Sequence, residues 1–518
     1  MKSKNFYFKP RDYRTIELWK DITQEEWNDP LWQMRNTIRN VDQLRKVIEL
    51  SEFQVQEIER TLMELQKAGK EALRITPYYA SLIDSNPFQT KNYQKEIGEK
   101  RLDPIFWQSV PTPANLLFPN TGKEGAMDEG CRSFGAAYQR YPNRVALFVG
   151  PNTNCASYCV HCQRAKTLDQ SVDISKSEIN RGLFYIRYNQ NINEVLVTGG
   201  DALMISRKML QYVLEELSSI EHLRVIRIAT RVPVVLPMAI TDELLSLIRL
   251  SANKHNKGIQ KYVYFMTHIN HYHEITEQMA QAVQKINNFG FTVRNQTVLL
   301  NHVNDHLKIL AETFRRMFWI GVHPYYLLQC HKEKGIVHFI TPVQIGKLFV
   351  KQLQGWISGV TMPRYAANIE GGGGKVLLMP SGHDTLNTGV TIDDHISQSR
   401  ATVRTWDGLI IEKYESLGRA SQQEYEQAVK IMDQFIGSKG YFVPKIIIED
   451  HEGKYVTTTN KKTLPIITQK KKSDMLDYTL FDNEMPLTNP FLIHEDLENL
   501  YSRYCKENSE YNHDNSHI

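Results

Sequence analysis

Short apolar runs alternate with amphipathic stretches between residues 140 and 385, and this alternation constrains the fold more than any other feature of the chain. Apolar runs of this length are typical of buried strands, and the stretches between them have the spacing of helices. Strands and helices that alternate in this way predict parallel βαβ units. We therefore expect an α/β fold, built as a doubly wound sheet or as a complete or partial α/β barrel. The predicted strands are Val145–Val149, Val195–Thr198, Val225–Ala229, Tyr262–Met266, Phe291–Val298 and Tyr325–Leu328, and the predicted helices are 177–187, 206–219, 241–252, 275–288 and 306–319.

The segments on either side of this core have a different character. Spaced apolar residues in a charged stretch predict a helical region from about residue 16 to 70. Beyond about residue 390 the chain is mixed and polar, with a basic cluster at Lys470–Lys472, and we predict that Lys506–Ile518 is frayed or disordered. We therefore divide the chain into an N-terminal helical region with a connecting segment (1–135), an α/β core (136–390) and a C-terminal extension (391–518).

Composition and charge argue against several classes of function. The chain has 62 Lys plus Arg and 58 Asp plus Glu, a net charge of only +4, which gives no general reason to expect a nucleic-acid partner. Its N-terminus lacks the apolar core of a secretory signal, and no apolar run approaches the ~18 residues that span a bilayer. We therefore expect a cytoplasmic protein with no membrane partner, whose six cysteines stay reduced and available for metal ligation.

Three of these cysteines lie on one short loop directly after the first predicted strand, in Cys155-Ala-Ser-Tyr-Cys159-Val-His-Cys162. Three thiolates can hold three irons of a four-iron cluster and leave the fourth iron open to an exogenous ligand. A zinc site with His161 as the fourth ligand is the alternative. Structural zinc sites usually pair two well-separated halves, whereas His161 is adjacent to Cys162. The spacing therefore favours a [4Fe–4S] cluster.

A glycine pair follows the second predicted strand, as Gly199-Gly200-Asp201. Such a sequence alone is a common turn. Its position about 40 residues after the cysteine loop favours a functional role, because ligands of α/β folds collect at the carboxyl ends of the strands.

Four consecutive glycines, Gly371–Gly374, precede Lys375. Such a run is costly in chain entropy and indicates that the backbone approaches a ligand closely. A phosphate-binding Walker loop is excluded by its spacing, because Val376 stands where that loop requires Ser or Thr. A lysine on a pliable loop can instead form a Schiff base with pyridoxal phosphate.

The cysteine loop and the glycine pair resemble the radical S-adenosylmethionine superfamily, in which the open iron chelates the amino and carboxylate groups of S-adenosylmethionine. With the glycine–lysine loop added, the chain resembles the lysine 2,3-aminomutase family over roughly residues 15 to 395. That family combines a [4Fe–4S] cluster, S-adenosylmethionine and pyridoxal phosphate, and the likeness implies a partial (β/α)6-type radical barrel. Further matching segments are Ile75–Asp84, Arg140–Arg144, Arg227–Arg231, Asn295–Leu300 and Pro324–Cys330.

The resemblance also implies a reaction and roles for individual residues. A radical formed from S-adenosylmethionine would take a hydrogen from Cβ of an amino acid held on pyridoxal phosphate, and the amino group would move from Cα to Cβ. An external electron donor of the flavodoxin or ferredoxin type would supply the reducing electron. Lys375 would form the Schiff base and Arg164 would hold the substrate α-carboxylate. Phosphate and pyridine contacts would come from Arg140, Tyr141, Arg144 and Arg231, and further cofactor contacts from Gly199, Gly200, Asp201 and Gln296. Each of these arginines taken alone would equally suit a surface salt bridge.

The substrate is indicated by two departures from the lysine enzymes of the family. Two aspartates hold the distal ammonium in those enzymes, and His331 and Asn368 stand at the matching positions here, with Lys332 beside the first. A buried ammonium without a counter-charge costs several kcal/mol. A carboxylate, in contrast, can accept a hydrogen bond from an amide and be neutralised by His331 or Lys332. We therefore predict that L-glutamate is converted to β-glutamate, with lysine, arginine or another amino acid as the alternative.

Assembly and other classes of function stay open at this stage. Some lysine enzymes bind zinc between subunits through cysteines after the barrel, one of them after a Val-Asn-Asp turn. Here that turn is Val303-Asn304-Asp305-His306, so we expect no such zinc site and leave a homo-oligomer open. An iron–sulfur electron-transfer or sensor protein would have no use for Lys375, and an isomerase acting on a lysyl side chain of a protein would need an open docking face. Ordinary thiols are the default for Cys131, Cys330 and Cys505.

Overall fold

The structure is a computed structural model of the chain. It describes residues 6–69, 73–122, 133–151, 154–162, 174–255, 260–369, 374–379, 400–404, 410–449, 455–457, 460–464 and 494–507. Arg164, Cys131, Gly371–Gly373, Lys470–Lys472 and the tail from 508 onward lie outside these residues, and so do the predictions made for them.

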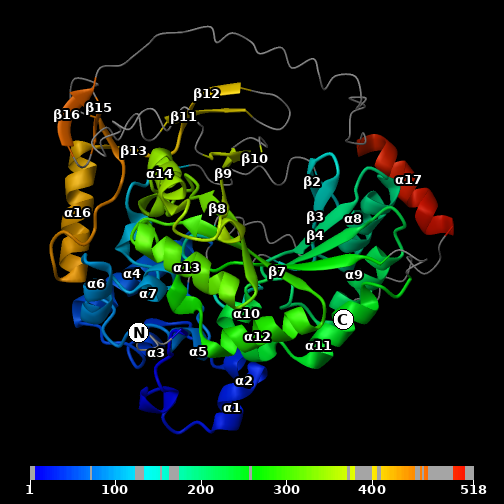
Figure 1. Cartoon of the computed structure of the whole chain (residues 1–518), viewed down its shortest axis with the longest axis horizontal. Helices are drawn as coiled ribbons and strands as arrows, with labels where there is room; N and C mark the ends of the chain where they lie inside the picture. Colours follow the sequence, from blue (N-terminus) through cyan, green and yellow to red (C-terminus); the bar gives the residue numbers. More distant parts are fainter. Residues whose placement is uncertain are drawn as a thin grey trace.

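Seven parallel strands, paired in chain order, form the centre of the molecule (Figure 1). They are β3 (Arg144–Phe148), β4 (Glu194–Thr198), β5 (Val225–Ala229), β6 (Tyr262–Thr267), β7 (Thr292–Leu299), β8 (Val322–Gln329) and β9 (Arg364–Ile369). The helices that follow the first six strands are α8 (Lys176–Tyr188), α9 (Arg207–Ser218), α11 (Asp242–Ser251), α12 (Glu277–Asn288), α13 (Leu307–Trp319) and α14 (Val343–Leu353). The predicted α/β class and the partial (β/α)6-type barrel are confirmed, and each predicted strand and helix falls on one of these elements.

Antiparallel strands extend this sheet at both ends. β2 (Ala137–Tyr141) pairs with β3 and is flanked by β1 (Ser133–Phe134), while β10 (Gly374–Leu377) pairs with β9. Within the described residues β1 and β10 are the two edges of a ten-stranded sheet and do not pair with each other, so the barrel is open.

Side chains along the parallel strands alternate between two environments. On β7, Val293, Asn295, Thr297 and Leu299 are fully buried, whereas the residues between them are only half-buried. This alternation is the period-two pattern of a strand whose one face packs on the helical layer. The other face is therefore left to line the interior of the barrel.

The N-terminal region covers one end of the barrel with short helices (Figure 1). They are α1 (Gln24–Asn28), α2 (Pro30–Arg35), α3 (Val41–Leu44), α4 (Glu52–Lys67), α5 (Pro77–Ala80), α6 (Lys91–Ile97) and α7 (Pro104–Ser109). The first four fall in the segment predicted to be helical. Capping boxes fix the starts of α1 (Thr23 with Glu26) and α4 (Ser51 with Gln54). All six residues of α7 are buried, and this helix reaches the cysteine loop, where the Val160 N–H donates to the Gln108 carbonyl over 2.9 Å.

The C-terminal extension packs against its own chain in two places. One unit contains α16 (Gln422–Ile436) and a four-stranded sheet of β13 (Arg419–Ser421), β14 (Ile447–Glu449), β15 (Tyr455–Thr457) and β16 (Asn460–Leu464). Lys445 of this unit and Arg101 of the N-terminal region both pair with the buried carboxylate of Asp305, at 2.6 and 2.8 Å. Thus the Val-Asn-Asp turn anchors the extension to the barrel.

The second contact is made by α17 (His494–Glu507), which lies on α8 at the far edge of the sheet (Figure 1). Arg181 of α8 pairs with Glu498, and the Tyr501 ring contacts Phe134 and Phe184. The helix runs to Glu507, so it includes the first two residues of the tail that we predict to be frayed or disordered. A separate hairpin joins β11 (Arg400–Arg404) to β12 (Ile410–Glu415). No helix among the described residues combines the length and apolar character needed to cross a bilayer.

Candidate active site

A cavity of about 460 Å³ lies at the carboxyl ends of the parallel strands, within the usual size range of small-molecule sites. Alternate side chains of the strands face it, for example Leu196 on β4, Arg227 on β5 and Gln296 on β7. The predicted site residues that line it are Cys155, Cys159, Cys162, Arg140, Tyr141, Arg144, Arg231, Gly199, Gly200, Asp201, Gln296, His331, Asn368 and Lys375. Lys332 is described but is not part of the wall, and Arg164 lies outside the described residues.

The cysteine loop is held against the N-terminal region by its backbone and one serine. The Tyr158 N–H donates to the Arg74 carbonyl over 2.8 Å, and the Thr76 N–H donates to Ser157 Oγ over 3.0 Å. Burial raises the pKa of the Cys159 thiol to about 11, although the nearby Arg231 opposes the shift. Three cavity-lining thiols on one rigid loop fit a cluster with one open iron, and binding must displace their protons.

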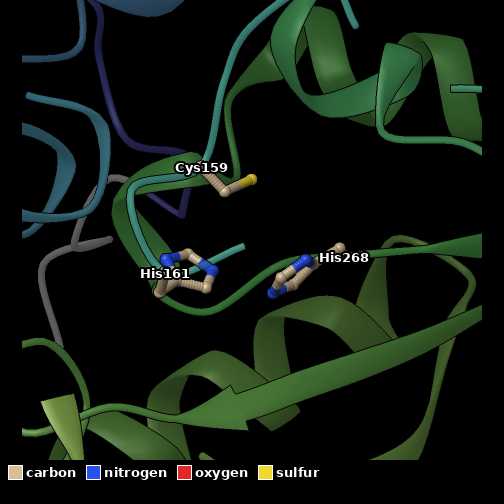
Figure 2. A group of neighbouring side chains, drawn as sticks. All are labelled: Cys159, His161 and His268. Carbon is tan, nitrogen blue, oxygen red and sulfur yellow. The ribbon is translucent and has the colours of Figure 1, made fainter. Parts of the chain in front are cut away.

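His161 belongs to the same loop, and His268 approaches it from the end of β6. Ligand atoms of Cys159, His161 and His268 lie within 4.8 Å of one another (Figure 2). Burial lowers the pKa of His268 to about 4 and that of His161 well below its ordinary value, so both rings are neutral. The side chain of Asn270 lies 3.3 Å from Nε2 of His161 and 2.9 Å from Nε2 of His268. One nitrogen of each ring is therefore satisfied by a neutral amide, without a metal ion.

Arg231, at the carboxyl end of β5, is buried in a polar network next to Cys159. Its Nη1 donates to Cys159 Sγ over 2.8 Å, and its Nη2 donates to Tyr79 Oη and to Glu274 Oε1, each over 2.6 Å. Its Nε donates to the carbonyl of His268 over 3.3 Å. The sequence resemblance implied contacts from Arg231 to pyridoxal phosphate, whereas the structure gives this guanidinium partners at the cysteine loop.

The glycine pair packs on the chain that leads into the cysteine loop. A Cβ atom at Gly199 would lie 2.8 Å from the carbonyl oxygen of Gly150, so only glycine fits there. The Gly200 N–H donates to the Pro151 carbonyl over 3.0 Å. Burial raises the pKa of Asp201, opposed by hydrogen bonds such as the 2.6 Å bond from the Arg231 N–H. This carboxylate is therefore already engaged with the protein's own backbone.

The lysine end of the cavity is built from β2, β9 and β10. Lys375 on β10 stands directly opposite Asn368 on β9, so the two side chains project to the same face. The Lys375 N–H donates to Tyr141 Oη over 2.7 Å, and the Arg144 guanidinium lies 3.9 Å from the Tyr141 ring centroid. The Arg140 guanidinium donates to Tyr138 Oη over 2.8 Å. Lys375, Tyr141 and Arg144 thus lie together at one end of the cavity, whereas Arg231 lies at the cysteine loop.

His331 and Asn368, the two predicted side-chain contacts, touch each other. Nδ2 of Asn368 lies 3.1 Å from Nε2 of His331. The Asn368 side chain is 6% exposed, and its Oδ1 has no hydrogen-bond partner among the described residues. Lys334, rather than Lys332, is the lysine of this segment that lines the cavity. No sequence pattern separates the two lysines, because they are only two residues apart.

The cavity wall is strongly cationic. Among its described residues Asp201 is the sole carboxylate. The cationic side chains are Arg140, Arg144, Arg227, Arg231, Lys334 and Lys375. Such a wall suits phosphate and carboxylate groups and opposes an additional ammonium. Arg227 was not predicted as a site residue, although it lies on a predicted strand and pairs with Glu194 at 2.7 Å.

The sequence of this chain is similar to those of amino acid 2,3-aminomutases. No family model matches the chain. It is 39% identical over 373 residues to an L-lysine 2,3-aminomutase of Methanococcus maripaludis, covering 71% of this chain and 79% of the relative. The L-lysine 2,3-aminomutase of Bacillus subtilis is 37% identical and covers 73% of this chain and 74% of the relative. The glutamate 2,3-aminomutase of Clostridioides difficile is 34% identical and covers 75% of this chain and 83% of the relative. Among solved structures, a mutant of spore photoproduct lyase overlaps 57% of this chain and 73% of that chain at 13% identity, with a TM-score of 0.25 that adds nothing to the fold.

Proposed function

The chain belongs to the lysine 2,3-aminomutase family, and we propose that it acts on L-glutamate, moving its α-amino group to Cβ to give β-glutamate. Its relatives are isomerases, so the chain is an amino acid 2,3-aminomutase. Both lysine and glutamate enzymes are among these relatives at similar identity, so overall similarity does not select the substrate.

The charge of the cavity wall carries the proposal for glutamate. A lysine substrate would bring an ε-ammonium to the end of the cavity formed by His331 and Asn368. Asp201, the one carboxylate among the described wall residues, is occupied by the Arg231 and Leu203 N–H groups. Burying an ammonium there without a counter-charge would cost several kcal/mol. A side-chain carboxylate instead meets Lys334 and a polar amide.

Asn368 can present a donor to this carboxylate by a simple rotation. The present orientation directs Nδ2 to His331 and leaves Oδ1 unpaired. The two amide orientations have nearly the same shape. In the rotated form His331 donates from Nε2 to Oδ1, and Nδ2 is free to donate to the substrate. We propose that the substrate carboxylate selects this form, with Lys334 as the nearby cation.

The residues present suit the cofactors of the family. We propose that Cys155, Cys159 and Cys162 hold a [4Fe–4S] cluster and that Lys375 holds pyridoxal phosphate. When bound, the cluster with S-adenosylmethionine supplies a radical strong enough to remove an unactivated hydrogen, and pyridoxal phosphate supplies an imine across which nitrogen can migrate.

The chain's own residues then position these groups. Arg140 and Arg144 hold the phosphate through charge-assisted hydrogen bonds, and Tyr141 fixes the backbone at Lys375. Gly199 lets the backbone approach the S-adenosylmethionine end of the cavity. The roles of Arg164 and Gln296, an external donor of the flavodoxin or ferredoxin type and a cytoplasmic location stay predictions.

Anaerobic reconstitution tests the proposal directly. The purified chain is loaded with iron, sulfide, pyridoxal phosphate and S-adenosylmethionine, reduced, and offered a panel of L-amino acids. We expect β-glutamate as the main product, and loss of the absorbance of bound pyridoxal phosphate in Lys375→Ala. Formation of β-lysine without β-glutamate would show that the substrate assignment is wrong while leaving the family assignment intact.

A further inference from the structure

One charged side chain donates a hydrogen bond directly to a cysteine sulfur of the proposed cluster loop. Nη1 of Arg231 lies 2.8 Å from Cys159 Sγ, and the arginine is only 8% exposed. Arg74, another described arginine near the loop, donates to the carbonyl oxygen of Cys155 over 3.2 Å. At Arg231 the positive charge and an N–H both face a sulfur.

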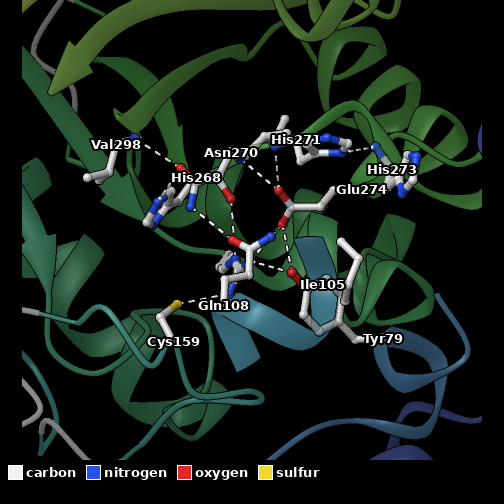
Figure 3. A network of polar contacts seen from close by, with 12 residues as sticks. Tyr79, Ile105, Gln108, Cys159, His268, Asn270, His271, His273, Glu274 and Val298 are labelled. Atoms are coloured by element: carbon white, nitrogen blue, oxygen red, sulfur yellow. Dashed lines mark hydrogen bonds and ion pairs between the residues drawn. The ribbon is translucent and has the colours of Figure 1, made fainter. Parts of the chain in front are cut away.

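Glu274 holds the Arg231 side chain in its orientation, on the side of the guanidinium that faces away from Cys159. The carboxylate of Glu274 is fully buried and accepts from Arg231 Nη2 and from the Tyr79 hydroxyl on one oxygen. The backbone N–H groups of Asn270 and His271 donate to its other oxygen over 2.7 and 2.9 Å (Figure 3). These four hydrogen bonds hold the carboxylate in place, and its pairing with Nη2 fixes the position of the arginine.

The guanidinium of Arg231 lies nearer to the Cys159 sulfur than the carboxylate of Glu274 does. The guanidinium touches Cys159 Sγ, whereas the carboxylate contacts the opposite side of the guanidinium. The field of the pair at the sulfur is therefore positive in sign, and the low polarity of a buried site enlarges it.

We propose that Arg231 sets the reduction potential of the iron–sulfur centre through this N–H···S hydrogen bond, with Glu274 and Tyr79 as positioning residues. The inference rests on the proposed presence of a [4Fe–4S] cluster on the cysteine loop. Reduction adds one electron from the external donor and no proton, so the cysteine sulfurs become more negative. A hydrogen bond and a positive charge at one sulfur stabilise that reduced state. Arg231 therefore raises the potential, and Glu274 moderates the increase.

The test is a redox titration of the reconstituted holoenzyme. The fraction of reduced cluster is monitored by its electron paramagnetic resonance signal. We expect Arg231→Gln to lower the midpoint potential and Glu274→Gln to raise it. Each change should alter the equilibrium constant for one-electron reduction by at least about tenfold, which is about 59 mV. Arg231→Lys retains the charge and should restore part of the potential lost in Arg231→Gln.

A matched control separates the hydrogen-bond network from general effects of packing. Tyr78 is the neighbour of Tyr79 on α5, is equally buried, and directs its hydroxyl to Thr276, away from the network. We expect Tyr78→Phe to leave the potential unchanged. Arg231→Gln leaves the carboxylate of Glu274 buried without its cation, which destabilises the fold. The double variant Arg231→Gln/Glu274→Gln removes both charges, so it allows the measurement if the single variant misfolds. Its potential should also lie below that of the unaltered protein.

Three results would overturn the inference. They are unchanged potentials in both single variants, shifts of both in the same direction, and a double variant with an unaltered potential. If the unaltered protein binds no iron and sulfide on reconstitution, the proposed cluster fails first and the inference fails with it. Iron and sulfide analysis therefore distinguishes the two failures.

Discussion

Substitution of Asn368 by aspartate places a negative charge where we propose that the substrate carboxylate binds. The side chain is buried and stands opposite Lys375, and it contacts His331 at 3.1 Å. The change is nearly isosteric, so it alters the charge with little alteration of shape. It therefore tests the substrate contact rather than the fold.

The expected size of the effect follows from the separation of the two charges. A hydrogen-bonded carboxylate would approach the new aspartate to about 4 Å, and two unit charges at that distance interact by about 4 kcal/mol at an effective dielectric constant near 20. Relaxation of the side chain and Lys334 nearby would reduce this, and about 2 kcal/mol is a reasonable lower bound. At 1.36 kcal/mol per factor of ten, kcat/KM for glutamate should fall by about 30- to 900-fold.

The assay compares kcat/KM for L-glutamate with the content of bound pyridoxal phosphate. We expect the first to fall and the second to stay near that of the unaltered protein, because Lys375, Arg140 and Arg144 are untouched. Asn368→Ala serves as the control that removes the amide without adding charge, and it should lose less activity than Asn368→Asp. Equal turnover of glutamate by Asn368→Asp would refute the reasoning, since residue 368 would then not contact the side chain.

Three further predictions concern other parts of the molecule. Lys334→Met should raise KM for glutamate about tenfold or more, whereas Lys332→Met should change it little, because only the first lysine lines the cavity; steady-state kinetics of the two variants would decide between them. Gly199→Ala should weaken binding of S-adenosylmethionine, measured by calorimetry on the reconstituted protein, because the added Cβ would lie 2.8 Å from a backbone oxygen. Asp305→Asn should destabilise the fold by about 3 kcal/mol at pH 7, because it leaves two cations without their buried partner. Burial alone would raise the pKa of Asp305, but its cationic partners outweigh it and hold the pKa well below the ordinary range. Its contribution is therefore present above the unfolded pKa of about 4 and is lost as pH falls through the folded pKa. Thermal unfolding should show this difference, and Asp12→Asn, at an exposed pair, should show almost none.

The centre of the fold could be predicted because its signal is local. Most parallel strands from β3 to β8 contain a short apolar run, β7 shows alternating burial, and each following helix has its own amphipathic period, so a window of about ten residues contains the information. β9 and β10 lack that signal. β9 contains polar Arg364 and Asn368, and β10 begins in the glycine run. These strands are stabilised by pairing with neighbours distant in the chain, which no local pattern records.

The residues of the candidate site likewise fall into two groups: those that a local sequence pattern identifies and those that only the fold brings together. The cysteine loop and Lys375 were identified because their residue types are rare and closely spaced. The partners of Arg231 could not be predicted, because Tyr79 comes from α5 and Glu274 from the segment after β6, and only the folded barrel brings them together. The choice between Lys332 and Lys334 likewise depends on the direction of one turn.

The two ends of the cavity differ in how firmly the protein holds them. At the cluster end, buried polar groups are hydrogen-bonded to residues of α7, of the end of β5 and of the segment after β6. Substitution of any one of these partners leaves another buried polar group without its hydrogen bond. At the substrate end, the bond between His331 and Asn368 leaves an amide oxygen that has no hydrogen-bond partner in the described part of the chain. Substitutions there carry a smaller structural penalty, so the preferred amino acid can change while the radical chemistry stays in place. On this argument, His331→Asp/Asn368→Asp should move the preference toward lysine without moving the cluster potential, whereas substitutions at Arg231 should move the potential without changing which amino acid is preferred.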